Sequence, residues 1–187
     1  MLPDSLLYYN DCVFTHRYTV IQRLGKYPFN KAVKILAISY NGEPDPNDDV
    51  KTIGDTTTPR KEKPHGLFFH NDTLDLSNIF EIKQLTAEQV AKLTNIMFNT
   101  KARIPNYHPD PGRKCFEPRD ALIFYDKKGK VFDYMEICFE CMMYESKSNK
   151  LFLTSVYCNQ QFDLIKKFLI SLGIQFGTTT TDASKYN

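Results

Sequence analysis

A chain of 187 residues is long enough to bury one substantial core, and 42% hydrophobic with 25% charged residues is the composition of a globular domain. The formal net charge of +2 is too small to indicate a nucleic-acid surface, and no basic run alternates with aromatic side chains. No stretch approaches the roughly 18 consecutive apolar residues of a membrane-spanning helix, so we expect a soluble protein without a membrane span.

The cysteine count bears on the compartment in which the protein works. Five cysteines are an odd number, which favours a reducing compartment such as the cytoplasm. The first residues, Met1-Leu2-Pro3-Asp4, do not resemble the charged start of a signal peptide. An exported protein whose signal had been removed would carry the same sequence, so the location stays open.

The first part of the chain predicts two strands separated by a long loop. Leu6 to Leu24 has no clean period, and both a helix and irregular packing remain open there. The apolar run from Lys31 to Tyr40 ends at Asn41-Gly42 and is typical of a strand. Residues 43–66 combine four prolines with Asp, Thr and Lys, which predicts an exposed loop. A second strand is expected over Ile79 to Lys83.

A helix is predicted over about 86–99. Thr86 and Gln89 have the spacing of a capping box, in which the threonine side chain and the glutamine side chain each bond the other residue's backbone N–H. Val90, Leu93 and Met97 then recur at helical spacing. This pattern indicates one apolar face that packs on a sheet.

Between this helix and Cys115, three prolines fall within Ile104 to Gly112. Proline excludes regular helix and central strand, so the segment should run as a loop. The loop would carry Tyr107, His108 and Asp110 toward Cys115, which makes it a candidate wall of a site; the alternative is a rigid connector without a role in binding.

The sequence most clearly predicts a central β-hairpin over about 120–139. Two apolar runs flank the turn from Asp126 to Gly129, where the glycine can adopt a positive φ. With this turn, Tyr125 faces Val131 across the hairpin. Both faces are apolar, which is typical of a strand pair buried on both sides. The same register places Asp120 opposite Glu136, a like-charge pair that would need a proton, a cation or a bulge before residue 120.

Three cysteines gather at the far end of this hairpin. Cys138 and Cys141 form a C-x2-C, and the register places Cys115 opposite Cys141. A zinc site would use Cys115, Cys138, Cys141 and His108 as ligands. A disulfide from Cys115 to one of the pair and reduced, buried thiols are the other possibilities. Cys12 and Cys158 are expected to be unrelated thiols.

The same residues carry a resemblance. Cys115, Pro118-Arg119 and the run Ile137-Cys138-Phe139-Glu140-Cys141 resemble a C-x2-P-R and I-C-F-E-C signature of uncharacterised bacterial proteins. The resemblance covers the central hairpin alone. It implies that Cys115, Arg119, Cys138 and Cys141 should be tested together, and it implies no particular activity.

The last part of the chain predicts a strand, a helix and a tail. Leu151 to Tyr157 is rich in aromatic and β-branched residues, as strands are. Asn159 should cap a second helix over about 159–172, which ends at Gly173 with Ile174 packing back on Leu169. Residues 178–187 have almost nothing to bury and should form a loose tail.

Together these elements predict an α+β fold with one domain over residues 1–177. A mostly antiparallel sheet would hold the central hairpin, and the helices 86–99 and 159–172 would pack on it. The loop 43–66 would project from the domain.

No nucleophile–base pair, phosphate-binding loop or carboxylate dyad can be defended in this sequence, so an enzyme is the less favoured class. The sequence favours a non-catalytic protein-binding domain of the inhibitor or immunity type, which acts on another protein through surface loops and needs no cofactor. The alternative is a zinc-stabilised or metal-dependent protein, and a weaker one is a thiol redox protein. The candidate binding residues are Tyr107, His108, Arg119, Glu136 and Glu140.

Among these residues, Arg119 should be partly buried and bonded to a carboxylate, because it lies between Pro118 and a fully apolar strand. The candidate partners are Asp120, Glu136 and Glu140.

Overall fold

The computed structural model describes residues 12–42, 66–102, 116–151 and 158–186, and over these residues the fold is α+β. Its centre is one antiparallel sheet with the strand order β5-β2-β7-β8-β9. The strands are β2 Lys34–Tyr40, β5 Ile79–Gln84, β7 Asp120–Tyr125, β8 Val131–Cys138 and β9 Met143–Ser146. The α+β class, the antiparallel sheet and the central hairpin that the sequence predicted are therefore confirmed.

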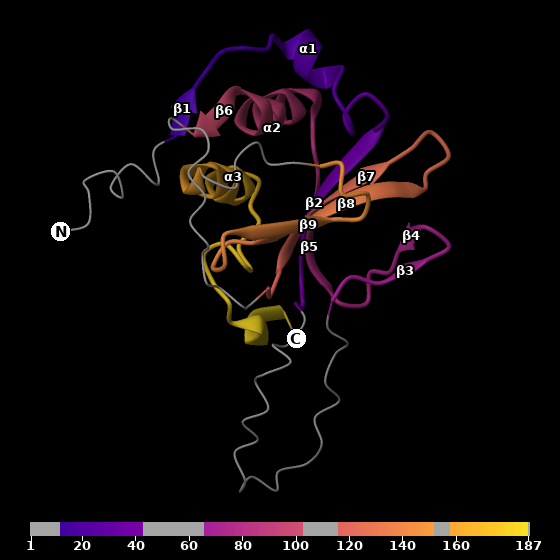
Figure 1. The fold of residues 1–187 in the computed structure, drawn as a ribbon. Coiled ribbons are helices and arrows are strands. Elements are labelled where there is room, and N and C mark those ends of the chain that lie inside the picture. Colours follow the sequence, from indigo (N-terminus) through magenta and orange to yellow (C-terminus); the bar gives the residue numbers. More distant parts are fainter. Residues whose placement is uncertain (1–11, 43–65, 103–115, 152–157, 187) are drawn as a thin grey trace, which may run out of the picture.

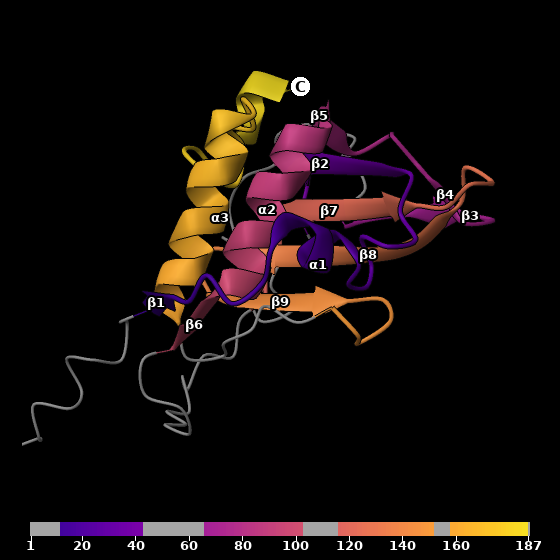
Figure 2. The ribbon, with the colours of Figure 1, turned by 90° about the horizontal axis from the view of Figure 1, so that it is seen from above.

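Two helices, α2 Ala87–Asn99 and α3 Asn159–Ser171, lie side by side over one face of this sheet (Figures 1 and 2). Their apolar stripes pack on the side chains of β2, β7 and β8 that point toward them. This core includes Leu93, Met97, Leu122, Ile165 and Phe168. The stripes predicted from the sequence are thus core surfaces that hold the helices on the sheet.

The opposite face of the sheet carries a second apolar cluster, which includes Ile38, Ala121 and Ile123. A small hairpin packs against it, made of β3 Phe69–His70 and β4 Thr73–Leu74. The Phe69 ring stacks on Tyr134 with 4.8 Å between the ring centroids. Every residue of β7 is buried, as expected for a strand that is apolar on both sides.

The register of the central hairpin matches the prediction at the turn and departs from it one residue later. Tyr125 pairs with Val131, but a bulge follows, and Phe124 pairs with Asp133. The shift continues along the ladder, so Asp120 faces Ile137. The predicted pairing of Asp120 with Glu136 is therefore wrong, because the bulge lies beside the turn instead of before residue 120.

The helix ends follow the local signals of the sequence with one correction. Thr86 and Gln89 form the predicted capping box at the start of α2. At the end of α3, the Gly173 and Ile174 N–H groups donate to Ile170 and Leu169, the bond pattern of a Schellman motif. Its N-cap, however, is Cys158 and not the predicted Asn159, and no side chain caps this end.

A short helix and two short strands complete the N-terminal part. Helix α1, Val20–Leu24, begins with a capping box between Thr19 and Gln22. Strand β1, Cys12–Phe14, pairs with β6, Thr100–Ala102, directly after α2. In Figure 1, β1 and β6 lie at the same level as α2 and α3. Helix α1 lies outside α2, on the side away from the sheet.

The C-terminal residues make more contacts than the predicted loose tail would. Thr178 is buried, and its hydroxyl donates to the Ile174 and Gln175 carbonyls. A 3₁₀ turn, Ala183–Tyr186, follows, and the Tyr186 ring stacks on Phe80 at 4.9 Å between centroids. The aromatic rings of Phe80 in β5 and of Phe176 thus give this segment a surface on which to pack.

Three predicted segments lie wholly or mostly outside the described residues. They are the loop 43–66, of which Gly66 alone is described, the loop 104–112, and the strand 151–157, of which Leu151 alone is described.

Candidate binding site

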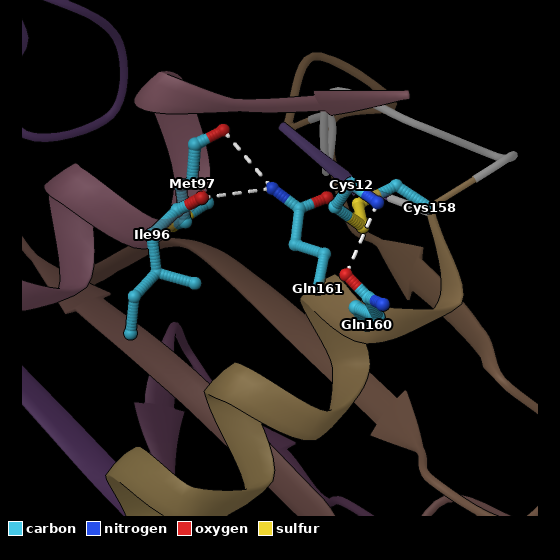
Figure 3. The surroundings of a disulfide bond; sticks show 6 residues. All are labelled: Cys12, Ile96, Met97, Cys158, Gln160 and Gln161. Atoms are coloured by element: carbon cyan, nitrogen blue, oxygen red, sulfur yellow. Dashed lines mark hydrogen bonds between the residues drawn. A yellow bond between two sulfur atoms is a disulfide. The ribbon is translucent and has the colours of Figure 1, made fainter. Parts of the chain in front are cut away.

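The structure joins two cysteines that the sequence analysis took to be unrelated thiols. Cys12 and Cys158 form a disulfide that links positions 146 residues apart in the sequence, with 5.2 Å between the Cα atoms. Gln160 and Gln161 flank it (Figure 3). The Cys12 N–H donates to Gln160 Oε1 at 3.1 Å. The prediction of unrelated thiols was therefore wrong, because spacing in the sequence carries no signal for so distant a pair.

Gln161 fixes the neighbouring ends of the two long helices. Its buried amide donates to the carbonyls of Ile96 at 2.9 Å and Met97 at 3.2 Å, near the end of α2 (Figure 3). The disulfide therefore links strand β1 to the start of α3, which Gln161 already bonds to the end of α2.

The C-x2-C motif at the end of β8 is compact. The chain turns over residues 139–142, and the Cys141 N–H donates to Cys138 Sγ at 3.2 Å. Both side chains are buried. Among the described residues, no three His, Cys, Asp or Glu side chains are grouped so that they could hold a metal ion. The other two predicted ligands, Cys115 and His108, lie outside those residues.

Arg119 forms the ion pair that the sequence predicted, together with one that it did not. Its guanidinium donates to Glu140 Oε2 at 3.0 Å and to Glu117 Oε2 at 2.9 Å. The Arg119 side chain is 22% exposed, so the prediction of partial burial and a carboxylate partner is confirmed for Glu140. Neither pairing gives Arg119 a chemical role beyond positioning these two carboxylates.

The remaining predicted binding residues do not join this cluster in the described structure. Glu136 lies on the other face of β8, where its Oε1 accepts a hydrogen bond from the Tyr40 hydroxyl at 2.7 Å. Tyr107 and His108 lie outside the described residues. Of the five predicted residues, the structure therefore brings Arg119 and Glu140 together.

A polar cavity of about 440 Å³ adjoins the Arg119 cluster through Glu140. Lys166 of α3 and the segment that follows this helix form the rest of its wall. The described lining residues are Glu140, Lys166, Gly177, Thr178, Thr179, Thr180, Thr181 and Asp182. Hydroxyl, ammonium and carboxylate groups can bind a polar ligand, but this described lining contains neither His nor Cys to act as a neutral base or a thiol nucleophile.

Asp120 lies buried next to the Gly177 wall of this cavity. Its side chain is 1% exposed, and neither carboxylate oxygen has a hydrogen-bond partner among the described residues. A Cβ on Gly177 would overlap this carboxylate, and Gly177 also has a positive φ of 77°. Glycine is therefore required at 177 for both conformation and space.

Burial raises the pKa of Asp120 well above its ordinary value, and the Glu81 carboxylate raises it further. Lys166 and Arg119 act in the opposite direction. Glu81, Ser39 and Asp120 face one another across β5, β2 and β7, so the two carboxyl groups share one face of the sheet. The sequence analysis thus expected a like-charge neighbour for Asp120 but named Glu136 instead of Glu81.

Glu81 holds the segment after α3 in place. Its carboxylate accepts hydrogen bonds from the backbone N–H groups of Gln175 and Phe176 at 2.9 and 3.0 Å. The hydroxyls of Ser39 and Tyr186 donate to it as well, at 2.6 and 3.2 Å. This carboxylate therefore positions the wall of the cavity from the edge strand β5.

Helix α1 differs from an ordinary surface helix because it buries a charged side chain and exposes its aliphatic ones. Its one buried residue is Arg23, which is 7% exposed, whereas Ile21 is 84% exposed. Val20 and Leu24 are exposed too. The aliphatic side chains of α1 therefore face outward, and such outward apolar groups are typical of interaction sites.

The buried Arg23 is bonded to neutral oxygens. It donates to the Tyr18 carbonyl at 2.7 Å and, with longer bonds of 3.4 Å, to Thr94 Oγ1 and the Ala91 carbonyl. Burial lowers its pKa below the ordinary value. These bonds fix α1 on α2 with the aliphatic side chains outward.

Two cations flank α1 in the sequence, Arg17 before it and Lys26 after it. Arg17 and Lys26 both lie over the Tyr18 ring, at 5.1 and 3.9 Å from its centroid. Within the described residues, neither forms an ion pair. We call Val20, Ile21 and Leu24, with Arg17 and Lys26, the α1 patch.

The sequence analysis missed the α1 patch because it looked for a clean apolar period over Leu6 to Leu24. A shorter signal was present, since Thr19 and Gln22 have the same capping-box spacing as Thr86 and Gln89. Which face of a five-residue helix points outward depends on tertiary contacts, so the capping box would have found the helix but not the patch.

Comparison of the chain with protein-family models, with curated proteins and with solved structures found no match. None of the helices in the described part of the chain has the length and apolar character that crossing a membrane requires.

Proposed function

We propose that the protein is a non-catalytic binding protein of the inhibitor or immunity type that docks on another protein. One observation carries this proposal, namely that α1 buries its arginine and exposes its aliphatic side chains. This orientation costs free energy in water unless a partner covers the exposed groups. The loop 104–114 and, apart from Gly66, the loop 43–66 lie outside the described residues, and both stay candidates for the same surface.

The polar cavity supports binding more than catalysis. Its described wall offers one ammonium group, two carboxylates and four threonine hydroxyls. Asp120 is buried and is not among the described residues that line the cavity. The Thr178 and Thr179 hydroxyls of this wall donate to backbone carbonyls and not to a side chain that could act as a base.

The experiment places a photo-reactive residue at position 21 in cells that make the protein. Irradiation should produce a specific protein adduct at position 21, because Ile21 is the most exposed residue of the patch. The matched control places the same residue at Leu76, an exposed aliphatic position in the β4–β5 connection that is 58% exposed. An adduct of the same mass and yield at both positions would contradict a docking role for α1.

The partner identified in this way then allows a direct affinity measurement. Ile21→Ser should weaken binding by about tenfold or more if the side chain is an interface anchor. The melting temperature should stay within about two degrees, because exposed substitutions change stability by about 0.5 kcal/mol or less.

The second candidate function is a metal-stabilised protein, and the turn at Cys138 favours it. A C-x2-C that continued as a strand would point its sulfurs to opposite faces, whereas the observed turn brings the Cys141 N–H onto Cys138 Sγ. Zinc would be held by Cys115, Cys138, Cys141 and His108, as the sequence suggests. Native mass spectrometry with thiol counting tests this candidate: one zinc per chain that is lost together with the fold on chelation would favour it over the binding protein.

A further inference from the structure

We infer that the α1 patch recognises an acidic protein surface, one that presents Asp or Glu side chains around an apolar pocket. This inference rests on the proposed function and names the chemistry of its partner. It follows from the charges on and around α1.

The whole N-terminal region of the described chain is cationic. Residues 12–42 contain five Lys or Arg residues and no Asp or Glu. One of the five, Arg23, is buried under α1, so the cations nearest to the helix that keep contact with solvent are Arg17, which is exposed, and Lys26, which is partly buried. The nearest acidic side chain of α2 in the sequence is Glu88, three residues before Ala91, where Arg23 bonds.

The position of Arg17 and Lys26 on one ring matters for recognition. Both cations contact the Tyr18 ring, which precedes α1 in the chain, and Lys26 also lies 5.6 Å from the centroid of the Phe98 ring. Two positive charges are therefore held at one ring next to α1, and among the described residues neither forms an ion pair. A partner carboxylate that approached the patch would gain attraction from both charges. The aliphatic side chains would at the same time enter an apolar pocket, which is the arrangement of an interface anchor with a charged rim.

A second copy of the chain fits this patch poorly. A two-fold interface presents the same patch on both subunits, so Arg17 and Lys26 of one copy would meet those of the other. Like charges brought together in this way oppose association. The cation pair therefore favours a different, acidic partner over self-association.

A membrane surface also fits the patch less well than a protein. Amphipathic helices that lie in the membrane interface are often 20–30 residues long and bury a continuous apolar face. Helix α1 has five residues and offers three aliphatic side chains. Such a short helix suits a shaped protein pocket, in which a few side chains supply most of the binding energy.

The inference can be tested without knowing the natural partner. Random peptides displayed on phage are selected on the disulfide-bonded protein after depletion on the Ile21→Ser variant. The selected peptides should combine Asp or Glu with Leu, Phe or Trp. Their affinity should fall as sodium chloride is raised, because exposed ion pairs are screened.

Charge reversal supplies the matched comparison. For a selected peptide, Arg17→Glu with Lys26→Glu should weaken binding by about tenfold or more. Reversing two exposed lysines of the distant hairpin turn, Lys127→Glu with Lys128→Glu, should change the affinity by less than about twofold.

The results of this selection distinguish a failure of the docking role of α1 from a failure of the acidic-partner inference. Neutral apolar peptides that need Ile21 would leave the docking role intact and overturn the acidic partner. Selection of no peptide that needs Ile21 would contradict both. Two further outcomes would also overturn the inference: cosedimentation with phosphatidylcholine–phosphatidylglycerol vesicles that is lost in Ile21→Ser, and a concentration-dependent dimer that is lost in the same variant.

Discussion

At the scale of single residues, two buried ionisable groups are held in different ways. Arg23 is satisfied by neutral oxygens, two of them backbone carbonyls. Asp120 has no hydrogen-bond partner among the described residues and lies on the same sheet face as Glu81. Burial without such partners favours the uncharged carboxyl form of Asp120.

The raised pKa of Asp120 predicts a pH-dependent stability. A carboxyl group whose folded pKa exceeds its unfolded value keeps its proton longer in the native state. Its favourable contribution is therefore fully present below the ordinary value of 3.8 and is lost as the pH rises through the folded pKa. The groups that face it are Glu81, Lys166 and Arg119, with Ser39 beside it.

We expect Asp120→Asn to remove this dependence, because asparagine does not titrate. The melting temperature of the variant minus that of the natural protein should become more positive as the pH rises above 3.8. The exposed residue Asp163 on α3 serves as the control, through Asp163→Asn. A difference for Asp120→Asn that stayed constant with pH would show that this carboxyl titrates normally.

Arg119→Ala should lower the free energy of unfolding by about 1 kcal/mol. The sequence alone suggested on the order of 3 kcal/mol, the cost of stranding a buried partner. The structure reduces this expectation, because Glu117 and Glu140 are 24% and 60% exposed and can regain water. Urea unfolding measures the change, and Lys147→Ala, which breaks the exposed pair with Asp72, provides the comparison. A loss near 3 kcal/mol would show that one carboxylate is left without solvent.

At the scale of elements, α1 depends on other elements for its position. Helices of five residues are not stable by themselves, so its capping box and its bonds to α2 must fix it. Strand β1 is similar, since a two-stranded pairing with β6 is marginal in water. Both N-terminal elements are therefore held by side chains and by the disulfide more than by their own backbone bonds.

Replacing Arg23 should release α1 from α2. Arg23→Met keeps much of the apolar stem but removes three donors, and we expect a loss of about 1–3 kcal/mol. Hydrogen exchange should show faster exchange confined to residues 18–26. Arg17→Met, which changes an exposed cation in the same region, should leave both measurements nearly unchanged. Equal effects of the two substitutions would contradict the anchoring role of Arg23.

At the scale of the whole molecule, the Cys12–Cys158 disulfide joins the first described residue to the N-cap of α3. It closes a loop of more than a hundred residues and fixes β1 at the start of α3. Disulfides persist in oxidising compartments and are rare in the cytosol. This bond therefore favours an oxidising compartment over the cytoplasmic location that the odd cysteine count suggested.

Removing the disulfide should lower the stability of the whole domain. The chain-entropy model gives about 5 kcal/mol for so long a loop, and measured losses are typically about 2–5 kcal/mol. The double variant Cys12→Ser with Cys158→Ser should match the natural protein under dithiothreitol, and reductant should not destabilise the variant further. Five reactive thiols in the unfolded, unreduced protein would show that the bond is absent.

The sequence alone determined those features that depend on neighbouring residues. The capping box of α2, the Schellman end of α3 and the turn at Gly129 each arise within a few residues, so their signals are local. The apolar runs on both sides of that turn were enough to predict a buried central hairpin. The Arg119–Glu140 ion pair was also predictable, because a cation beside a buried strand needs a carboxylate within reach.

Tertiary structure decided the features that join distant residues. The bulge at Phe124 moved Asp120 away from Glu136, and strand order then placed it in line with Glu81. The disulfide joined two cysteines that carry no mutual signal in the sequence. Packing against α2 turned Arg23 inward and Ile21 outward. Contacts between distant residues form when the helices and the sheet pack together. A local sequence pattern therefore cannot predict them.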